Sequence, residues 1–472
     1  MEQLPSAHIE AFHVISAAAK TLDQPVFVVG GYVRDYYLDR IPESGKQDID
    51  FVTVGSGIRL AKAVAKQIPG CSLTVFKQFG TAQVKTGELE LEFVGARKES
   101  YRRDSRKPIV EDGTIEDDQR RRDLTINALY WSLNESTFGD LMDPFEGVND
   151  LKERIIRTPI DPKQTFDDDP LRMMRAIRFA TQLDFHIEEQ TFNAIREMAP
   201  RLSIISKERV LDELNKIIMS PKPSIGFALL FKTALLDQFF PEMVDLHGVK
   251  EVRGHRHKDN FWHTLQVLDN AVDMGADLWL RWAAILHDIA KPPTQRFQEG
   301  VGWTFHGHDA LGAKWVKRIF RRLGLPLDER MRYVQKLVRL HLRPIALVND
   351  IVTDSAIRRL IFDAGDYIDD LMLLCKADIT SKNEYKVEKY RNNFARVEQK
   401  IKDVEEKDRI RNWTNPLSGE EIMEALGLEP CKTVGDIKHA VKEAILNGDI
   451  PNNRDAAFEF MMTHKESFLQ KR

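Results

Sequence analysis

The chain has 472 residues, 42% apolar and 30% charged, so it is long enough for several domains and its composition excludes disorder throughout. Lysine and arginine number 69 against 73 aspartate and glutamate, and this net charge of −4 excludes a histone-like protein but not a local nucleic-acid-binding face. Three scattered cysteines exclude a disulfide framework. Because the chain also has no membrane-spanning apolar run and no signal-peptide pattern, we expect a cytoplasmic protein without a membrane partner.

Residues 1–150 predict a mixed α/β domain. Strands are expected at 26–29, 49–54, 81–84 and 89–94, because these runs are β-branched or alternate between apolar and polar residues. Residues 58–67 carry apolar residues at helical spacing. The stretch 98–122 carries many charges of both signs, and the sequence does not separate an exposed, mobile loop from an ordered contact.

From about residue 160 the pattern is helical. One helix is expected to begin at Pro170, a residue that favours the first turn of a helix. Others are expected at 206–219, 261–275, 277–290, 309–323, 329–341, 355–376 and 383–405, the last of them solvated. Residues 413–417 predict a linker before a last helical piece.

Carboxylates at alternating positions indicate a metal site in the first domain. Asp48 and Asp50 lie two residues apart on a predicted strand, so both project from one face and can hold divalent cations for attack on a nucleotide phosphate. The alternative is a solvated turn. Glu92 adds a third carboxylate from a later strand, and Glu90 has the same parity, so the pattern does not separate the two.

Two further motifs favour phosphate and ribose binding. Gly30 and Gly31 follow the first strand and open a helix, where backbone N–H groups approach a phosphate, although many such pairs are only turns. Downstream, Arg122 can grip a phosphate, while Asp123 and Asn127 can bind ribose hydroxyls.

Asp169 and Arg172 share a helix face and offer an acceptor and a forked donor to a base edge. GGYVRD, DID, RRDLTIN and DDPLRMMRAIRFA, in this order, resemble class II tRNA nucleotidyltransferases and bacterial poly(A) polymerases. The resemblance implies a polymerase-β-like head that selects the base without a nucleic-acid template. Asp48 and Asp50 would hold Mg²⁺, with Glu92 as the third catalytic candidate. The nucleotide-binding candidates are Gly30, Gly31, Arg34, Arg122, Asp123, Asn127, Asp169, Arg172 and Arg175. Asp168 departs from the family, which usually has glutamate there, so its role is open.

The helical body contains a second set of candidate metal ligands. They are His263, His287, Asp288, His308, His341 and Asp378, a ligand set that suits Mn, Fe, Ni, Zn or Mg. A single histidine of this kind is more often structural, but the ordered set resembles the HD phosphohydrolase superfamily. The resemblance implies a primary divalent-metal site of His263, His287, Asp288 and Asp378, with a second metal at His308 and His341. His306 competes with His308. Such sites are typical of phosphatases and phosphodiesterases.

Residues 311–345 contain ten lysines and arginines against two acidic residues, which predicts either an RNA-backbone-binding face or a solvated helix pair. Residues 416–419, 435–438 and 447–450 resemble the family's RNA-holding segment. The expected fold class is α+β, with a mixed-sheet head and an extended all-α body. The expected domains are a nucleotidyltransferase head at 1–150, a nucleotide-selecting neck at 151–240, an HD-type metal domain at 241–405 and a tRNA-binding segment at 406–472.

The leading hypothesis is a CCA-adding enzyme that transfers CMP and AMP from CTP and ATP to the tRNA 3′ end and releases pyrophosphate. A poly(A) polymerase, or a partial enzyme adding only CC or only A, shares the same motifs. An HD phosphohydrolase with an inactive head, or a non-catalytic RNA-binding protein, is the alternative from another class. The sequence does not predict an oligomeric state.

Overall fold

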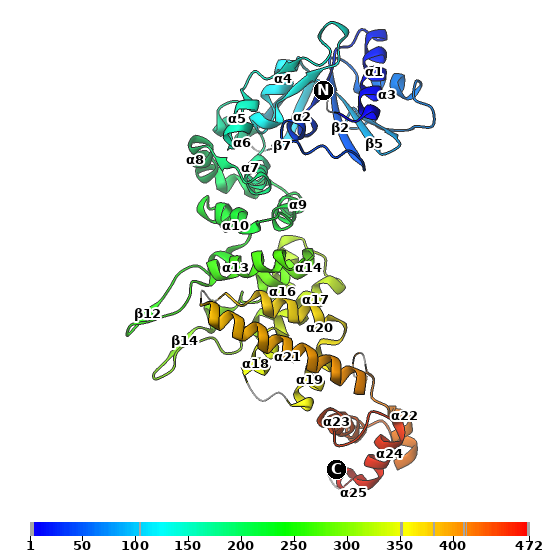
Figure 1. Ribbon diagram of the computed structural model, residues 1–472, viewed down its shortest axis with the longest axis vertical. Helices are drawn as coiled ribbons and strands as arrows, with labels where there is room; N and C mark the ends of the chain where they lie inside the picture. The colour runs from blue at the N-terminus through cyan, green and yellow to red at the C-terminus, as the bar shows by residue number, and fades with distance from the viewer. Residues whose placement is uncertain are drawn as a thin grey trace. The chain divides into compact units, whose positions relative to one another are not determined.

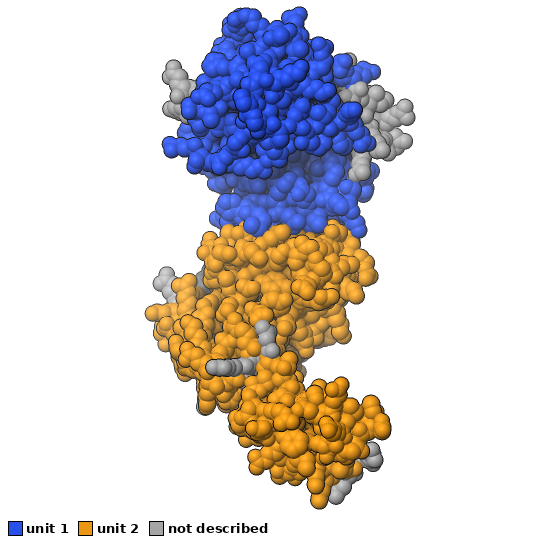
Figure 2. Space-filling view, turned by 90° about the vertical axis from the view of Figure 1, so that its right-hand side faces the viewer, with its two compact units in different colours: residues 1–241 blue, residues 242–472 orange. Residues whose placement is uncertain are grey.

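The computed structural model describes residues 4–102, 105–349, 353–380, 383–408, 411 and 413–469. The chain divides into two compact units, residues 1–241 and 242–472 (Figure 2). The finer division into four domains stays a prediction.

A seven-stranded mixed sheet forms the centre of the head in unit 1, in the order β3-β4-β5-β2-β1-β8-β9 (Figure 1). Its strands are β1 (Val26–Val29), β2 (Gln47–Thr53), β3 (Ser72–Phe76), β4 (Thr81–Thr86), β5 (Leu89–Gly95), β8 (Tyr130–Ser132) and β9 (Leu141–Met142). β2 and β5 are parallel, and the other neighbours are antiparallel. The four predicted strands are confirmed, whereas β3, β8 and β9 were not predicted.

The head's core fixes which side of β2 is free for chemistry. The head helices are α1 (Ser6–Thr21), α2 (Gly31–Tyr37), α3 (Gly57–Ala65), α4 (Ile115–Arg120) and α5 (Gly147–Glu153). Ile49 and Phe51 of β2 are fully buried, and the Phe51 ring stacks on Phe93 of β5 with 5.0 Å between centroids. Strand alternation therefore places Asp48 and Asp50 on the opposite, exposed side.

The charged stretch 98–122, for which the sequence left a mobile loop and an ordered contact open, is largely regular structure. β6 (Arg97–Arg102) and β7 (Ser105–Asp112) form an antiparallel hairpin, and α4 follows it. α4 begins in a capping box, in which Thr114 and Asp117 bond each other's backbone N–H groups. Regular secondary structure therefore replaces the mobile-loop alternative over the described part of this stretch, and charge density alone did not distinguish the two.

The rest of unit 1 is helical apart from a short parallel strand pair, β10 (Ile155–Ile156) and β11 (His186–Ile187). Its helices are α6 (Pro162–Asp168), α7 (Leu171–Leu183), α8 (Glu189–Met198), α9 (Lys207–Ile218), α10 (Pro223–Lys232) and α11 (Leu235–Phe239), followed by α12 (Pro241–Val244) at the division. α7 begins directly after Pro170, as predicted, and packs against α9 and α10. One end of α7 therefore stands beside the head motifs described below.

Unit 2 is also helical, with two short hairpins, β12 (Glu251–Val252) to β13 (His255–Arg256) and β14 (Arg296–Gln298) to β15 (Gly302–Thr304). Its helices are α13 (Asn260–Asp273), α14 (Leu278–Leu286), α15 (Lys291–Thr294), α16 (His308–Leu323), α17 (Glu329–Leu340), α18 (Leu342–Asn349), α19 (Asp354–Ala364), α20 (Ile368–Ala377), α21 (Glu384–Asp408), α22 (Gly419–Leu426), α23 (Lys432–Asn447), α24 (Arg454–Thr463) and α25 (Lys465–Leu469). Among the described residues, no helix is long and apolar enough to cross a bilayer.

Two helix predictions in unit 2 are corrected. The helix predicted at 355–376 is two helices, because Gly365 has φ +58° and ψ −134°, a region open essentially only to glycine. The helix predicted at 383–405 is not simply solvated. α21 buries Phe394, Val397, Ile401 and Val404 in a helical stripe, and it packs against α18 and α19.

Candidate functional site

The carboxylates of the head lie on neighbouring parallel strands. Asp50 is in register with Glu92, and Asp48 with Glu90. Asp50 lines the pocket described below, where surrounding protein atoms displace water, and this desolvation raises its pKa. The charge of Arg122 opposes the rise and that of Asp48 adds to it. Partial desolvation also raises the pKa of Glu92, with further increases from the two aspartates. Oxygen ligands that repel one another in this way fit a divalent cation, although the three do not converge to within 4.8 Å in the described structure.

Glu90 has different neighbours from Glu92. Its carboxylate lies 2.7 Å from the Lys46 ammonium group and 2.9 Å from that of Lys85. Hydrogen bonds from these two lysines lower the pKa of Glu90 to about 2. The negative charge of Glu90 is therefore already balanced by two lysines. This difference separates Glu90 from Glu92, which the sequence pattern left equivalent.

A polar pocket of about 520 Å³ brings the remaining head motifs together. All nine predicted nucleotide-binding residues line it, together with Asp50, whereas Asp48, Glu92 and Asp168 do not. Seven arginines and three aspartates face the pocket, a cationic excess that suits a triphosphate. The sequence reasoning missed Arg121, Leu171, Arg178, Phe179, Gln182 and Arg209. Arg121, Leu171, Arg178 and Phe179 lie inside the quoted motifs but were given no role of their own. Gln182 lies two residues beyond the α7 motif, and Arg209 on α9 has no local sequence signal.

Gly30 links β1 to α2 with a backbone that other residues adopt only under strain, at φ +72° and ψ −129°. An added Cβ there would lie 3.6 Å from a guanidinium nitrogen of Arg122. The Arg34 side chain on α2 donates to Asn127 Oδ1 at 2.9 Å, which holds a cation against the turn.

The Asp123 carboxylate makes hydrogen bonds that connect several residues lining the pocket. Its Oδ1 accepts from Asn127 Nδ2 at 3.0 Å and from the Leu124 N–H at 2.9 Å, and its Oδ2 accepts from Arg175 Nε at 2.6 Å. Burial by itself would raise the pKa of Asp123, but Arg175 and the Asn127 bond outweigh it and bring the pKa to about 2. Asp123 thus ties the RRDLTIN segment to α7, and its oxygens are occupied by protein donors.

The predicted base-reading pair stands at the start of α7. Asp169 Oδ1 accepts from the Leu171 N–H at 3.0 Å, and Asp169 Oδ2 accepts from Arg209 at 3.0 Å. Arg172 is 7% exposed and donates to the Thr165 carbonyl at 3.4 Å. These bonds fix the orientation of both side chains before any ligand arrives.

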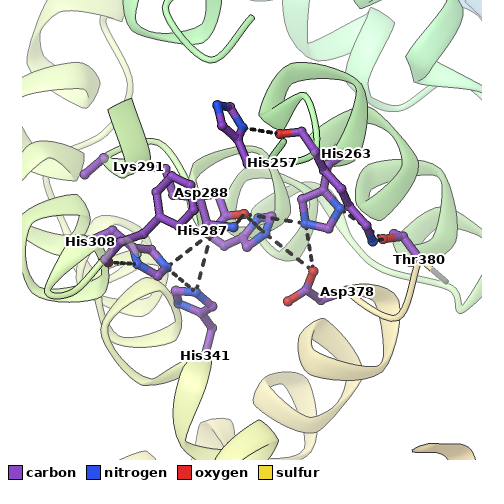
Figure 3. Close-up of polar contacts among 12 residues, drawn as sticks. His257, His263, His287, Asp288, Lys291, His308, His341, Asp378 and Thr380 are labelled. Carbon is purple, nitrogen blue, oxygen red and sulfur yellow. Dashed lines mark hydrogen bonds and ion pairs between the residues drawn. The ribbon is translucent and has the colours of Figure 1, made fainter. Parts of the chain in front are cut away.

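The six histidine and aspartate candidates of unit 2 converge (Figure 3). They form two groups whose ligand atoms lie within 4.8 Å of one another: His263, His287 and Asp378, and Asp288, His308 and His341. Asp288 faces both groups. Its Oδ2 lies 3.1 Å from His287 Nε2, and its Oδ1 lies 3.3 Å from His308 Nε2. A carboxylate placed in this way is suited to bridge two metal ions.

Hydrogen bonds behind the rings aim the histidines at the centre. The Nδ1 atoms of His287, His308 and His341 lie 2.6–2.7 Å from backbone carbonyl oxygens of Ala284, Phe305 and Val338. A carbonyl only accepts, so each Nδ1 donates, and a neutral ring then presents the Nε2 lone pair inward. His287 Nε2 is buried and has no hydrogen-bond partner among the described residues, as a metal ligand requires.

The pKa shifts within the cluster show that its carboxylates favour a positive charge. Burial by itself lowers the pKa of His263, but Asp288 and Asp378 outweigh it and raise the pKa to about 9. Burial, reinforced by His287, lowers the pKa of His341 to about 4. His306 is exposed and belongs to neither group, so the geometry favours His308.

Three family models match the chain. They are the poly A polymerase head domain over residues 26–157, the probable RNA- and SrmB-binding site of polymerase A over 184–246, and the HD domain over 260–382. The Thermotoga maritima CCA-adding enzyme, solved in complex with tRNA, shares the fold. Its TM-score is 0.62 at 21% identity, covering 98% of this chain and 97% of that one.

Two relatives match nearly the whole chain. An A-adding tRNA nucleotidyltransferase of Deinococcus radiodurans is 32% identical, covering 91% of this chain and 93% of the relative. A CC-adding tRNA nucleotidyltransferase of Thermus thermophilus is 29% identical, covering 91% and 92%. Together with the fold, these matches define a nucleotidyltransferase with an HD domain in its second unit. The chain belongs to the tRNA nucleotidyltransferase family.

Proposed function

We propose that this protein completes the CCA end of tRNA, adding CMP and AMP from CTP and ATP to the 3′ end. The observation that carries the proposal is the arginine-rich pocket, in which the Gly30–Gly31 turn, Asp50 and the Asp169–Arg172 pair meet. The tRNA 3′-hydroxyl attacks the α-phosphate, the bond to the β-phosphate breaks, and pyrophosphate leaves. Mg²⁺ held by Asp48 and Asp50, with Glu92 beside them, would supply Lewis-acid activation when bound.

Other pocket residues bind the triphosphate and recognise the base. Arginines 34, 122 and 175 neutralise the triphosphate, and the Gly31 end of α2 offers backbone N–H groups. Asp169 accepts from an exocyclic amino group and Arg172 donates to a neighbouring ring acceptor. Cytosine and adenine both carry an amino group, so one residue pair can serve both nucleotides.

The test resolves products at single-nucleotide length, using tRNA that ends before CCA or after CC, with CTP and ATP separately and together. Addition of C, C and A followed by a stop supports the proposal. An enzyme that adds only A is the second candidate, because the relative at 32% identity over 91% of this chain is A-adding. Extension of tRNA-CC alone would establish that candidate. A long adenosine tail from ATP alone would indicate a poly(A) polymerase.

We also propose that the HD cluster hydrolyses phosphoesters. Two groups of ligands joined by Asp288 suit two divalent cations, which would polarise the phosphoryl group and activate water when bound. Lys291 Nζ lies 2.5 Å from Asp288 Oδ2 and adds a cation at the edge of the cluster.

The hydrolase proposal is tested by phosphomonoester and phosphodiester hydrolysis with each divalent metal in turn. His308→Ala is expected to lower the rate at least about tenfold, as the loss of a metal ligand should. The matched variant His306→Ala changes an exposed histidine two residues away and is expected to keep the wild-type rate. Equal rates in both variants, or no hydrolysis by the wild type with any metal, would reject the assignment.

A further inference from the structure

Helix α16 presents a wholly basic outer face. Its exposed cations are Lys314, Lys317, Arg318, Arg321 and Arg322. Its opposite face buries Val316, Ile319, Phe320 and Leu323 in the core of unit 2. The sequence has no acidic residue between 310 and 323, so the exposed face carries cations over about 10 Å of helix at 1.5 Å per residue.

Outside this face, the cations of the predicted basic stretch have partners within the protein. Arg332 lies 4.0 Å from Glu329, and the half-buried Lys336 donates to the Ala364 carbonyl at 3.2 Å. Outside α16, Arg330 pairs with Asp328 at 2.5 Å, Arg339 pairs with Asp309, and Arg343 pairs with Asp363. On α16, Arg322 pairs closely with Glu242, and Arg318 lies 3.5 Å from the same carboxylate. Arg318 also lies over the Trp315 ring, at 4.5 Å.

Three exposed cations of the α16 face have no acidic partner among the described residues. Lys314, Lys317 and Arg321 form no ion pair with any described residue, and all three are exposed. The C-terminal helices are acidic overall, with ten acidic residues against five lysines and arginines in residues 413–469. Uncompensated cations on a helix surface complement a polyanion.

We infer that the α16 face binds the phosphate backbone of the tRNA while its 3′ end is extended. The inference rests on the proposed tRNA substrate and names a contact surface for it. Cations that bind phosphates release counterions from the RNA, so they set affinity and its salt dependence rather than base choice. The face therefore affects tRNA and leaves CTP and ATP binding unchanged.

The test compares three triple variants of the full chain. The first, Lys314→Glu/Lys317→Glu/Arg321→Glu, reverses the face. The second, Lys314→Arg/Lys317→Arg/Arg321→Lys, keeps its charge. The third, Lys389→Glu/Arg396→Glu/Lys402→Glu, makes the same change of net charge at exposed positions of α21. tRNA Kd is measured from 50 to 300 mM KCl, with KM for tRNA and for CTP, and thermal melting verifies folding.

The reversed variant is expected to raise tRNA Kd and KM at least about tenfold at low salt, with KM for CTP unchanged. The slope of log affinity against log salt should fall by about two to three, because three contacts are lost at roughly 0.7–0.9 each. The charge-keeping and α21 variants are expected to match the wild type. Wild-type affinity and slope in the reversed variant, or an equal loss in the α21 variant, would overturn the inference.

If the wild type neither binds nor extends tRNA, the proposed function itself fails. If the reversed variant melts early, Lys317→Gln alone must still lower the salt slope by about one.

Discussion

At the scale of single residues, Glu90 and Glu92 differ in their neighbours and not in their position in the alternating pattern. Glu90 is neutralised by two lysines, whereas Glu92 stands beside aspartates that raise its pKa. Glu92→Gln is expected to lower kcat for single-nucleotide addition at least about a hundredfold, because it removes a charged oxygen ligand next to Asp50. Glu90→Gln should stay within about threefold, since the Glu90 carboxylate is bound to Lys46 and Lys85 and is not available to a metal ion. The measurement is kcat at saturating CTP, and similar losses in both variants would contradict the assignment.

Asp123 provides a pH-dependent prediction. Its folded pKa of about 2 lies below the ordinary 3.8, so the ionised group stabilises the fold above about pH 4, and this stabilisation is lost as the pH falls toward 2. The shift corresponds to about 2 kcal/mol. Asp123→Asn should lose about that much unfolding free energy at pH 7 and at pH 5, with a smaller deficit below pH 4.

Urea denaturation at each pH measures this deficit. Arg175→Met serves as the control, because Arg175 Nε lies 2.6 Å from the Asp123 carboxylate and is its main stabilising partner. The double variant should lose less than the sum of the two single losses. Strict additivity would show that the contact does not stabilise the fold.

At the scale of elements, the sequence predicted the strands that carry chemistry and left out longer-range features. β2 and β5 alternate between buried apolar and charged residues, so the period alone predicts them. The position of Arg209 against Asp169 depends on how α9 packs on α7, and the buried stripe of α21 depends on its packing partners. Likewise the break at Gly365 follows from a backbone angle that helical periodicity does not reveal.

Two glycine-to-alanine substitutions test whether the backbone of Gly365 causes the break between α19 and α20. Gly365→Ala is expected to destabilise unit 2 by about 1–3 kcal/mol, because alanine is strained at φ +58° and ψ −134°. Gly435→Ala is its matched control. Gly435 lies inside α23 with open space around an added Cβ, so alanine should stabilise by about 0.5–1 kcal/mol. Chemical denaturation compares the two. A gain in stability from Gly365→Ala would mean that the chain does not require the break.

At the scale of the whole molecule, each compact unit contains all the residues of one candidate functional site. Every residue lining the arginine-rich pocket lies within 1–241, and all six candidate metal ligands of the HD cluster lie within 242–472. Each unit also buries its own apolar core, with Phe51 and Phe93 in the first and Trp282 and Phe320 in the second. Neither set of side chains needs an atom of the other unit to hold its geometry.

This separation predicts that the nucleotide addition and the proposed phosphoester hydrolysis can be removed independently. Asp50→Asn should abolish nucleotide addition and leave metal-dependent phosphoester hydrolysis within about twofold of wild type. Asp288→Asn should do the reverse, because it removes the carboxylate that faces both ligand groups. Both substitutions keep side-chain volume, and melting curves establish that each variant is folded. The two assays are run on the same preparations, with metal content measured for each. Loss of both activities from Asp288→Asn in a folded protein would show that the HD cluster controls the head, and the two sites would then have to be treated as one coupled system.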